Sequence, residues 1–243
     1  MITPKITGAI ITGIIIFLGV ALLFPALRIG NNQDENARIL LTFNIVNSSN
    51  LPTWSDNLSQ YLRENNIHST VFITGIMADT YPTCASGFGR NTDIGSMSYD
   101  YTKITSIKSY PDQLNQVLRG KQSVDIQGKL NSTVFRAPYG SVDENIYSLL
   151  SRSHILADFS YDNHYNVYTD GLSGKTFYWF PTKTLANLSN IRYSDLNNKI
   201  PLMINFYNYD SLKSIEEAVN VTSKYSHQYI SASEITDIEL TRR

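Results

Sequence analysis

An apolar run from Arg38 to Asn47 places the strongest constraint on how this chain can fold. The run is rich in Ile, Leu and Phe, and a polar cluster that ends at Pro52 follows it. A continuous apolar run of this length is typical of a strand covered on both faces, as in a parallel sheet. Functional residues of such sheets lie at the carboxyl ends of the strands. Asn44 and Ile45 stand at that end, so the strand brings an amide and a hydrocarbon to a place where a hydrolase is expected to have acids.

Strand and helix patterns alternate from this run to the end of the chain. Strands are predicted at 38–47, 70–76, 93–97, 132–135, 155–161, 176–180, 201–206 and 229–231. Helices are predicted at 54–64, 77–81, 111–118, 144–151 and 214–223. Alternation of this kind over about 210 residues, without a long linker, predicts one α/β barrel or open sheet.

Composition excludes several classes of function. The chain has 20 basic and 21 acidic residues, so we expect no nucleic-acid partner. Its 42% hydrophobic content is enough for a sizeable core. The single Cys84 excludes an intramolecular disulfide and a zinc site built on several thiolates.

Residues 6–27 carry no charge and match the length of about 20 residues that spans a bilayer. The run is longer than the apolar core of a cleaved signal peptide, so an uncleaved anchor is expected. Flanking charges favour the amino terminus inside and the domain outside. The predicted organisation is a cytoplasmic tip at 1–5, a transmembrane anchor at 6–27, a tether at 28–36 and an extracytoplasmic domain at 37–243.

Short motifs along the domain follow one another in a distinctive order. They are Leu41-Thr42-Phe43-Asn44-Ile45, Thr70-Val71-Phe72-Ile73-Thr74-Gly75, Ile94 to Tyr101, Phe135-Arg136-Ala137-Pro138-Tyr139-Gly140, Leu202-Met203-Ile204-Asn205 and Tyr229 to Ile235. In order and spacing they resemble the polysaccharide deacetylase family, also called the NodB-homology domain. The resemblance implies an irregular (β/α)7-type barrel of the glycoside hydrolase/deacetylase-like kind. The apolar run at 6–27 predicts one transmembrane helix before it.

This sequence departs from the family at every position that carries its chemistry. The resemblance places the three metal ligands of the family, an Asp and two His, at Ile45, Met97 and Tyr101. It places the catalytic base at Asn44 and the general acid at Ile204. These side chains do not hold zinc in the usual way, and an amide accepts no proton at neutral pH. We therefore predict no cofactor and a catalytically inactive protein on a deacetylase scaffold.

Four residues at the mouth of the predicted barrel, where its strands end, are predicted to bind substrate: Arg136, Pro138, Tyr139 and Asp162. Arg136 has two candidate roles, a buried ion pair with Asp162 or Asp93, or a hydrogen-bond donor to a sugar or carboxylate. Tyrosine rings stack on sugars while their hydroxyls form hydrogen bonds. The tyrosines predicted at the mouth are Tyr99, Tyr101, Tyr139, Tyr161, Tyr165 and Tyr168. Ile45, Met97 and Tyr101 are expected to pack as a plug in the space of the metal.

Three hypotheses about function follow from the sequence. The first is a single-pass membrane protein with an inactive deacetylase-like domain that binds an extracellular or cell-wall glycan or supports an envelope assembly. The second is an active carbohydrate deacetylase that holds a divalent metal such as zinc through displaced ligands, Asp100, Asp162 and His164. The third is a barrel that only docks a protein partner. The other histidines, His68, His154 and His227, are expected to be structural or exposed.

Overall fold

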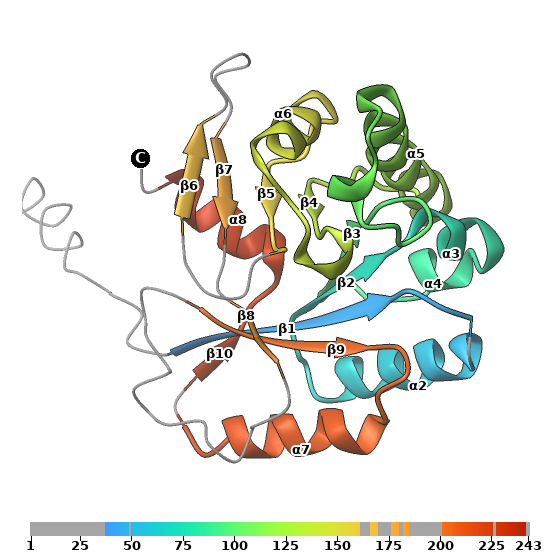
Figure 1. The fold of residues 1–243 in the computed structure, drawn as a ribbon. Coiled ribbons are helices and arrows are strands. Elements are labelled where there is room, and N and C mark those ends of the chain that lie inside the picture. The colour runs from blue at the N-terminus through green and yellow to red at the C-terminus, as the bar shows by residue number, and fades with distance from the viewer. Residues whose placement is uncertain are drawn as a thin grey trace, which may run out of the picture. The chain divides into compact units, whose positions relative to one another are not determined.

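A parallel β-sheet forms the centre of the domain in a computed structural model of the chain (Figure 1). The structure describes residues 37–48, 50–160, 166–169, 176–179, 182–184, 201–225 and 227–241. The predicted tip, anchor and tether lie outside these residues. Among the described helices, none is both long and apolar enough to cross a membrane.

Ten strands make up the sheet, in the order β6-β7-β5-β4-β3-β2-β1-β9-β8, and β10 pairs with the start of β1. Their bounds are β1 Ala37–Ile45, β2 Ser69–Ile73, β3 Thr92–Ser96, β4 Val134–Phe135, β5 Ala157–Asp158, β6 Asn166–Thr169, β7 Thr176–Trp179, β8 Thr182–Thr184, β9 Leu202–Tyr207 and β10 His227–Tyr229. All pairs are parallel except β6 with β7. Among the described strands no pairing joins β6 to β8, so the predicted α/β sheet is an open half-barrel.

Helices α2 to α7 lie between strands in the chain order and pack around the sheet (Figure 1), whereas α8 follows the last strand and packs against the inner core. Their bounds are α2 Leu51–Glu64, α3 Gly75–Thr80, α4 Thr83–Ser86, α5 Tyr110–Gly128, α6 Glu144–Arg152, α7 Leu212–Thr222 and α8 Ala232–Thr241, with 3-10 turns η1 at Ile104–Ser106 and η2 at Pro138–Gly140. The predicted helix at 111–118 is too short, because α5 continues to Gly128 and ends at Lys129 in the left-handed conformation.

Strand β1 separates two layers of core because its side chains alternate between the faces of the sheet. Leu41 and Phe43 belong to an outer core that also contains residues of α2 and α7. Leu40 belongs to an inner core with Phe72 and Met97. Thr42 lies between these positions and is completely buried, so the alternation carries a polar group to the inner face.

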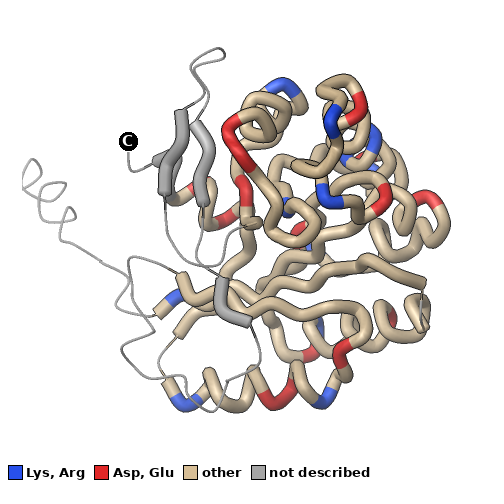
Figure 2. Tube along the Cα trace, in the orientation of Figure 1, with Lys and Arg blue, Asp and Glu red and all other residues tan. Residues whose placement is uncertain are grey.

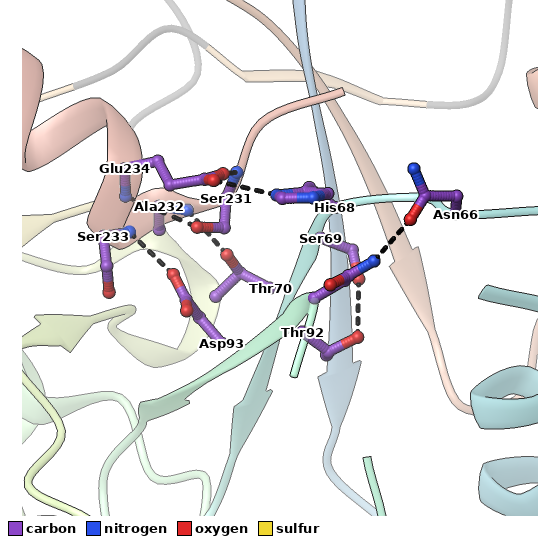
Figure 3. A network of polar contacts seen from close by, with 11 residues as sticks. Asn66, His68, Ser69, Thr70, Thr92, Asp93, Ser231, Ala232, Ser233 and Glu234 are labelled. Atoms are coloured by element: carbon purple, nitrogen blue, oxygen red, sulfur yellow. Dashed lines mark hydrogen bonds and ion pairs between the residues drawn. The ribbon is translucent and has the colours of Figure 1, made fainter. Parts of the chain in front are cut away.

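Helix α8 docks at the amino ends of β2 and β3 through its first turn (Figure 3). The Ala232 amide donates to Thr70 Oγ1 at 2.8 Å, and the Ser233 amide donates to Asp93 Oδ2 at 2.9 Å. Such bonds satisfy amides that have no partner within the helix. Asp93 therefore accepts a hydrogen bond from α8 at the end of the sheet opposite the mouth. The predicted ion pair between Asp93 and Arg136 is wrong.

Candidate functional site

Arg136 follows β4 and points into the inner face of the sheet, where it is buried. Its backbone amide donates to Ser96 O at 3.1 Å, which extends the pairing of β3 with β4 by one residue. Nη1 donates to Thr42 Oγ1 at 2.9 Å and to Asn205 Oδ1, and Nη2 lies 3.2 Å from Met203 Sδ. One guanidinium therefore connects β4 with β1 and β9.

The strand register brings these partners together. Thr42 lies opposite Asn205 in the parallel pairing of β1 with β9, and its hydroxyl donates to Asn205 Oδ1 at 2.9 Å. The Asn44 amide nitrogen donates to the same oxygen and to Phe206 O at 2.8 Å. Asn44 Oδ1 in turn accepts a long bond of 3.5 Å from Arg136. The amide at the position of the family base is thus engaged on both its nitrogen and its oxygen.

The guanidinium group of Arg136 is buried, so its charge is poorly solvated. Burial lowers the pKa of Arg136 to about 10, while Tyr207, Asp158 and Tyr101 act in the opposite direction. Its hydrogen-bonding partners Thr42, Asn44 and Asn205 are neutral. Among the described residues Arg136 donates hydrogen bonds within the fold. Asp162 lies outside the described residues, so both the ion pair with Asp162 and the role of Arg136 as a donor to a sugar or carboxylate stay predictions.

Asp158 at the end of β5 is an acid that the sequence did not single out. Ser160 donates to its Oδ1 through both its amide, at 3.2 Å, and its hydroxyl. The same hydroxyl accepts a bond of 2.6 Å from the Ala137 amide. Burial raises the pKa of Asp158 to about 7, against the opposing effects of Ser160 and Arg136. Asp158 is completely buried, and its bond to the Ser160 hydroxyl positions that group to accept from the Ala137 amide in the turn after β4.

The turn η2 projects Tyr139 into solvent. Pro138 is buried beside it, and Tyr139 itself has a φ of 59°, in the left-handed region. Gly140 follows with a φ of 62°, and a Cβ at this position would lie 2.7 Å from Ser160 O. Only glycine fits this approach without strain. The backbone therefore fixes an orientation in which the Tyr139 side chain is 69% exposed.

Four tyrosines meet at the mouth, and we call Tyr101, Tyr139, Tyr207 and Tyr209 the tyrosine cluster. The ring centroids of Tyr101 and Tyr139 lie 4.9 Å apart, and those of Tyr207 and Tyr209 lie 5.0 Å apart in a parallel stack. Burial and a side-chain hydrogen bond with Tyr207 raise the pKa of Tyr101, which joins the two pairs. Tyr99 lies outside the cluster, because its ring stacks on a guanidinium of α5 at 3.5 Å.

Strand β9 ends at Tyr207, and the hydrogen-bonded loop that follows it carries Tyr209. The Asn208 side chain accepts a bond from the Val46 amide at 3.1 Å and donates to Asn47 O at 2.9 Å. The Tyr207 amide donates to Asp210 Oδ2 at 2.7 Å. Hydrogen bonds thereby connect the loop after β9 to the loop after β1. Tyr207 and Tyr209 had no motif to mark them, and only the alternation of β9 past Asn205 indicates where they point.

Of the three residues expected to plug the space of the metal, two pack at the inner core and one does not. Met97 is 1% exposed and lies in the inner core, and Tyr101 packs against that core. Ile45 is completely buried in the outer core, on the opposite face of β1. Val46, one residue later, packs against the inner core instead. The predicted plug is therefore correct for Met97 and Tyr101 and wrong for Ile45, because side chains alternate along a strand.

The same alternation shows which residue of β9 faces the inner side of the sheet. Ile204 pairs with Leu41, and both residues belong to the outer core. Asn205 is the residue that reaches the inner face and bonds to Arg136. The residue of β9 that belongs to the site is therefore Asn205, one position after the residue that the motif suggested.

The residues at the metal positions do not fit a zinc ion. A hydrocarbon, a thioether and a phenol stand there, whereas zinc takes thiolate, imidazole and carboxylate ligands. Among the described residues no group of three or more His, Cys, Asp or Glu could hold a metal. Asp100 is described, and its Oδ1 accepts from the Thr102 amide at 3.1 Å. The other displaced ligands and predicted mouth residues fall where side chains are not described: Tyr161, Asp162, His164, Tyr165 and Tyr168.

The remaining histidines have the structural or exposed positions expected of them. His68 Nδ1 lies 2.8 Å from Glu234 Oε1, beside α8 (Figure 3). His227 Nδ1 contacts Tyr225 O at 2.7 Å. His154 is exposed, with a φ of 58°.

Comparison with known proteins identifies the family. The sequence model described as polysaccharide deacetylase matches residues 31–155, and the chain therefore belongs to the polysaccharide deacetylase family. Among curated proteins none matches the chain.

Solved structures share the fold at low identity. A putative polysaccharide deacetylase from Mycobacterium smegmatis is 12% identical with a TM-score of 0.67, covering 86% of this chain and 92% of that one. A family 4 carbohydrate esterase from Streptomyces lividans, in complex with acetate, is 16% identical with a TM-score of 0.56, covering 78% and 89%. A family 4 pseudoenzyme from Bacillus anthracis is 9% identical with a TM-score of 0.62, covering 83% and 66%.

Proposed function

We propose that this protein is a catalytically inactive polysaccharide deacetylase that binds glycan at the tyrosine cluster. One observation carries the proposal: four tyrosines gather at the place where the family performs its chemistry, and two of them are mostly exposed. The exposed fractions are 69% for Tyr139 and 62% for Tyr209. An aromatic ring offers a sugar an apolar face together with a polar tip. Loops that are hydrogen-bonded to the strands hold both rings, so little conformational entropy is lost on binding.

The absence of catalysis follows from the side chains at the mouth. A general base must reach its substrate and accept a proton. Asn44 does neither, because its amide has no basic site at neutral pH and is buried in bonds to Phe206 and Asn205. Asp158 is an acid near Arg136, but it is completely buried and its Oδ1 is bonded to Ser160. The part of the mouth that the structure describes thus has a scaffold suited to glycan recognition and no side chain placed to act as the general base.

We place this domain outside the cytoplasm on a single-pass anchor. The support is the uncharged apolar run at 6–27, followed by the short polar tether at 28–36. A glycan of the cell wall or of the extracellular space is then the polymer within reach of the mouth.

Binding to chitooligosaccharides tests this function. We expect the double substitution Tyr139→Ala with Tyr209→Ala to weaken binding at least tenfold in isothermal titration calorimetry, because the stacking surface is lost. Tyr110→Ala is the matched control, since Tyr110 is also exposed, at 39%, but lies on α5. Equal affinity of the wild type and the double variant would contradict the proposal. So would acetate release accompanied by stoichiometric zinc in the purified protein.

A further inference from the structure

The loops around the tyrosine cluster are acidic. The segments 97–109, 137–144 and 207–211 lie at the ends of β3, β4 and β9, and they carry Asp100, Asp143, Glu144 and Asp210 against the cations Lys103 and Lys108. Loops 46–50 and 74–76, which follow β1 and β2, carry no charged residue. Figure 2 marks the acidic and basic positions along the described trace. Four acids and two bases give these loops a net charge of −2.

Two of these acids lie within or beside the cluster itself. Asp210 follows Tyr209 and contributes, after burial and Tyr207, to the raised pKa of Tyr209. Asp100 precedes Tyr101 and is exposed. A ligand that stacks on the exposed rings therefore meets carboxylates at its edge.

The cation Arg136 lies below the tyrosine cluster. Because it is buried, a ligand meets the exposed parts of the mouth first. Arg136 is only 6% exposed and donates its hydrogen bonds to side chains of β1 and β9. The exposed rings and the acidic loops lie at the rim, in contact with solvent. A positively charged ligand group therefore meets carboxylates and tyrosine faces before it approaches the guanidinium.

We infer that the tyrosine cluster prefers glycans that carry free amino groups over acetylated or acidic glycans. This inference rests on the proposed function and names its ligand class. An ammonium group is attracted both by carboxylates and by the face of a tyrosine ring. An acetylated sugar gains the stacking alone, and a uronic acid is repelled by the acidic rim.

The preference gives the protein a place in a reaction sequence. A free amine on such a glycan arises when the amide bond to an acetyl group is hydrolysed, with water supplying the oxygen of the released acetate and a proton for the amine. The chain would then recognise the product of a deacetylation that another enzyme carries out.

The test compares three oligosaccharides of equal length on the full chain: N-acetylated chitooligosaccharide, its fully de-N-acetylated counterpart and oligogalacturonate. Titrations are run in a buffer acidic enough to keep the sugar amines protonated. We expect the amine form to bind at least fivefold more tightly than the acetylated form and oligogalacturonate to bind least. Salt should reduce the preference, because it screens exposed charges.

Charge variants link the preference to the rim. In the double variant Asp100→Asn with Asp210→Asn, the preference for the amine form should fall below twofold, while Glu64→Gln, an exposed acid at the end of α2, should keep it. Thermal melting of each variant shows that the fold is retained. Equal or tighter binding of the acetylated form overturns the inference and leaves the proposed glycan site standing. Binding of none of the three overturns both, and an amine preference unchanged by the rim variants overturns the assignment to this site.

Discussion

Arg136 is a buried cation whose hydrogen bonds join β4 to β1 and β9. A buried charge is costly unless it is paired and hydrogen-bonded. Here the bonds of the guanidinium go to a hydroxyl, two amides and a thioether, drawn from β1 and β9. Burial accordingly lowers its pKa to about 10. The residue retains a structural value, because it joins three strands at the point where the sheet opens to solvent.

Asp158 gives a prediction at the same scale. Its folded-state pKa of about 7 lies above the usual 3.8, so the unfolded chain ionises first as the pH rises. The stability contributed by its neutral form is therefore complete below pH 3.8 and is lost as the pH passes about 7. Asp158→Asn should match the wild type at low pH and exceed its free energy of unfolding above neutrality, by on the order of 2–4 kcal/mol. Urea unfolding at several pH values measures this difference.

Asp112→Asn is the control for that experiment, because Asp112 is exposed in the first turn of α5. It should keep the pH dependence of the wild type. A constant difference between Asp158→Asn and the wild type across the pH range would show that the pKa of Asp158 is the same in the folded and the unfolded state, which would contradict the prediction.

At the scale of elements, the strand pattern was the most predictable part of the molecule. Apolar runs located β1, β2 and β9 within a few residues, because these strands are buried along nearly their whole length. The face on which each residue lies required the register. Ile45 and Ile204 stand at motif positions, yet both point into the outer core.

The tyrosine cluster was only half predictable for a related reason. Tyr101 and Tyr139 belong to motifs with known places in the family. Tyr207 and Tyr209 come to the mouth through a loop whose shape depends on bonds from Asn208 to the loop after β1. Contacts between segments about 160 residues apart leave no periodic signal in the sequence.

The first turn of α8 supports a prediction about an element. Glu234 Oε2 accepts from the Ser231 amide at 2.7 Å, and its Oε1 pairs with His68, so one side chain caps the helix and ties it to the sheet. Glu234→Ala should lower the free energy of unfolding by about 1–2 kcal/mol and raise amide hydrogen exchange in α8. Glu217→Ala, an exposed acid on α7, should change stability by less than about 0.5 kcal/mol. Equal effects of the two substitutions would mean that the cap does not hold α8.

At the scale of the whole molecule, the residues at the family's metal positions are distributed over both layers of core. Met97 and Tyr101 fill the inner side, while Ile45 is completely buried in the outer one. The side chains at the metal positions are therefore part of the packed cores of the half-barrel. Restoring a metal site means placing polar groups in two separate apolar environments, and that carries a cost in stability wherever the new group lacks a partner.

Reversal of the family positions tests this view. The variant Asn44→Asp, Ile45→Asp, Met97→His and Tyr101→His restores the metal ligands and the base that the family motifs require. We expect it to lose stability by at least about 3 kcal/mol, chiefly because Ile45→Asp buries a carboxylate in the outer core. We also expect neither stoichiometric zinc nor acetate release, which metal analysis and an acetate assay measure. The triple variant without Ile45→Asp should recover most of the stability, because it leaves the outer core intact. Zinc binding with acetate release by the fourfold variant would show instead that the end of β1 can turn Ile45 toward the mouth and that the scaffold stayed competent for catalysis.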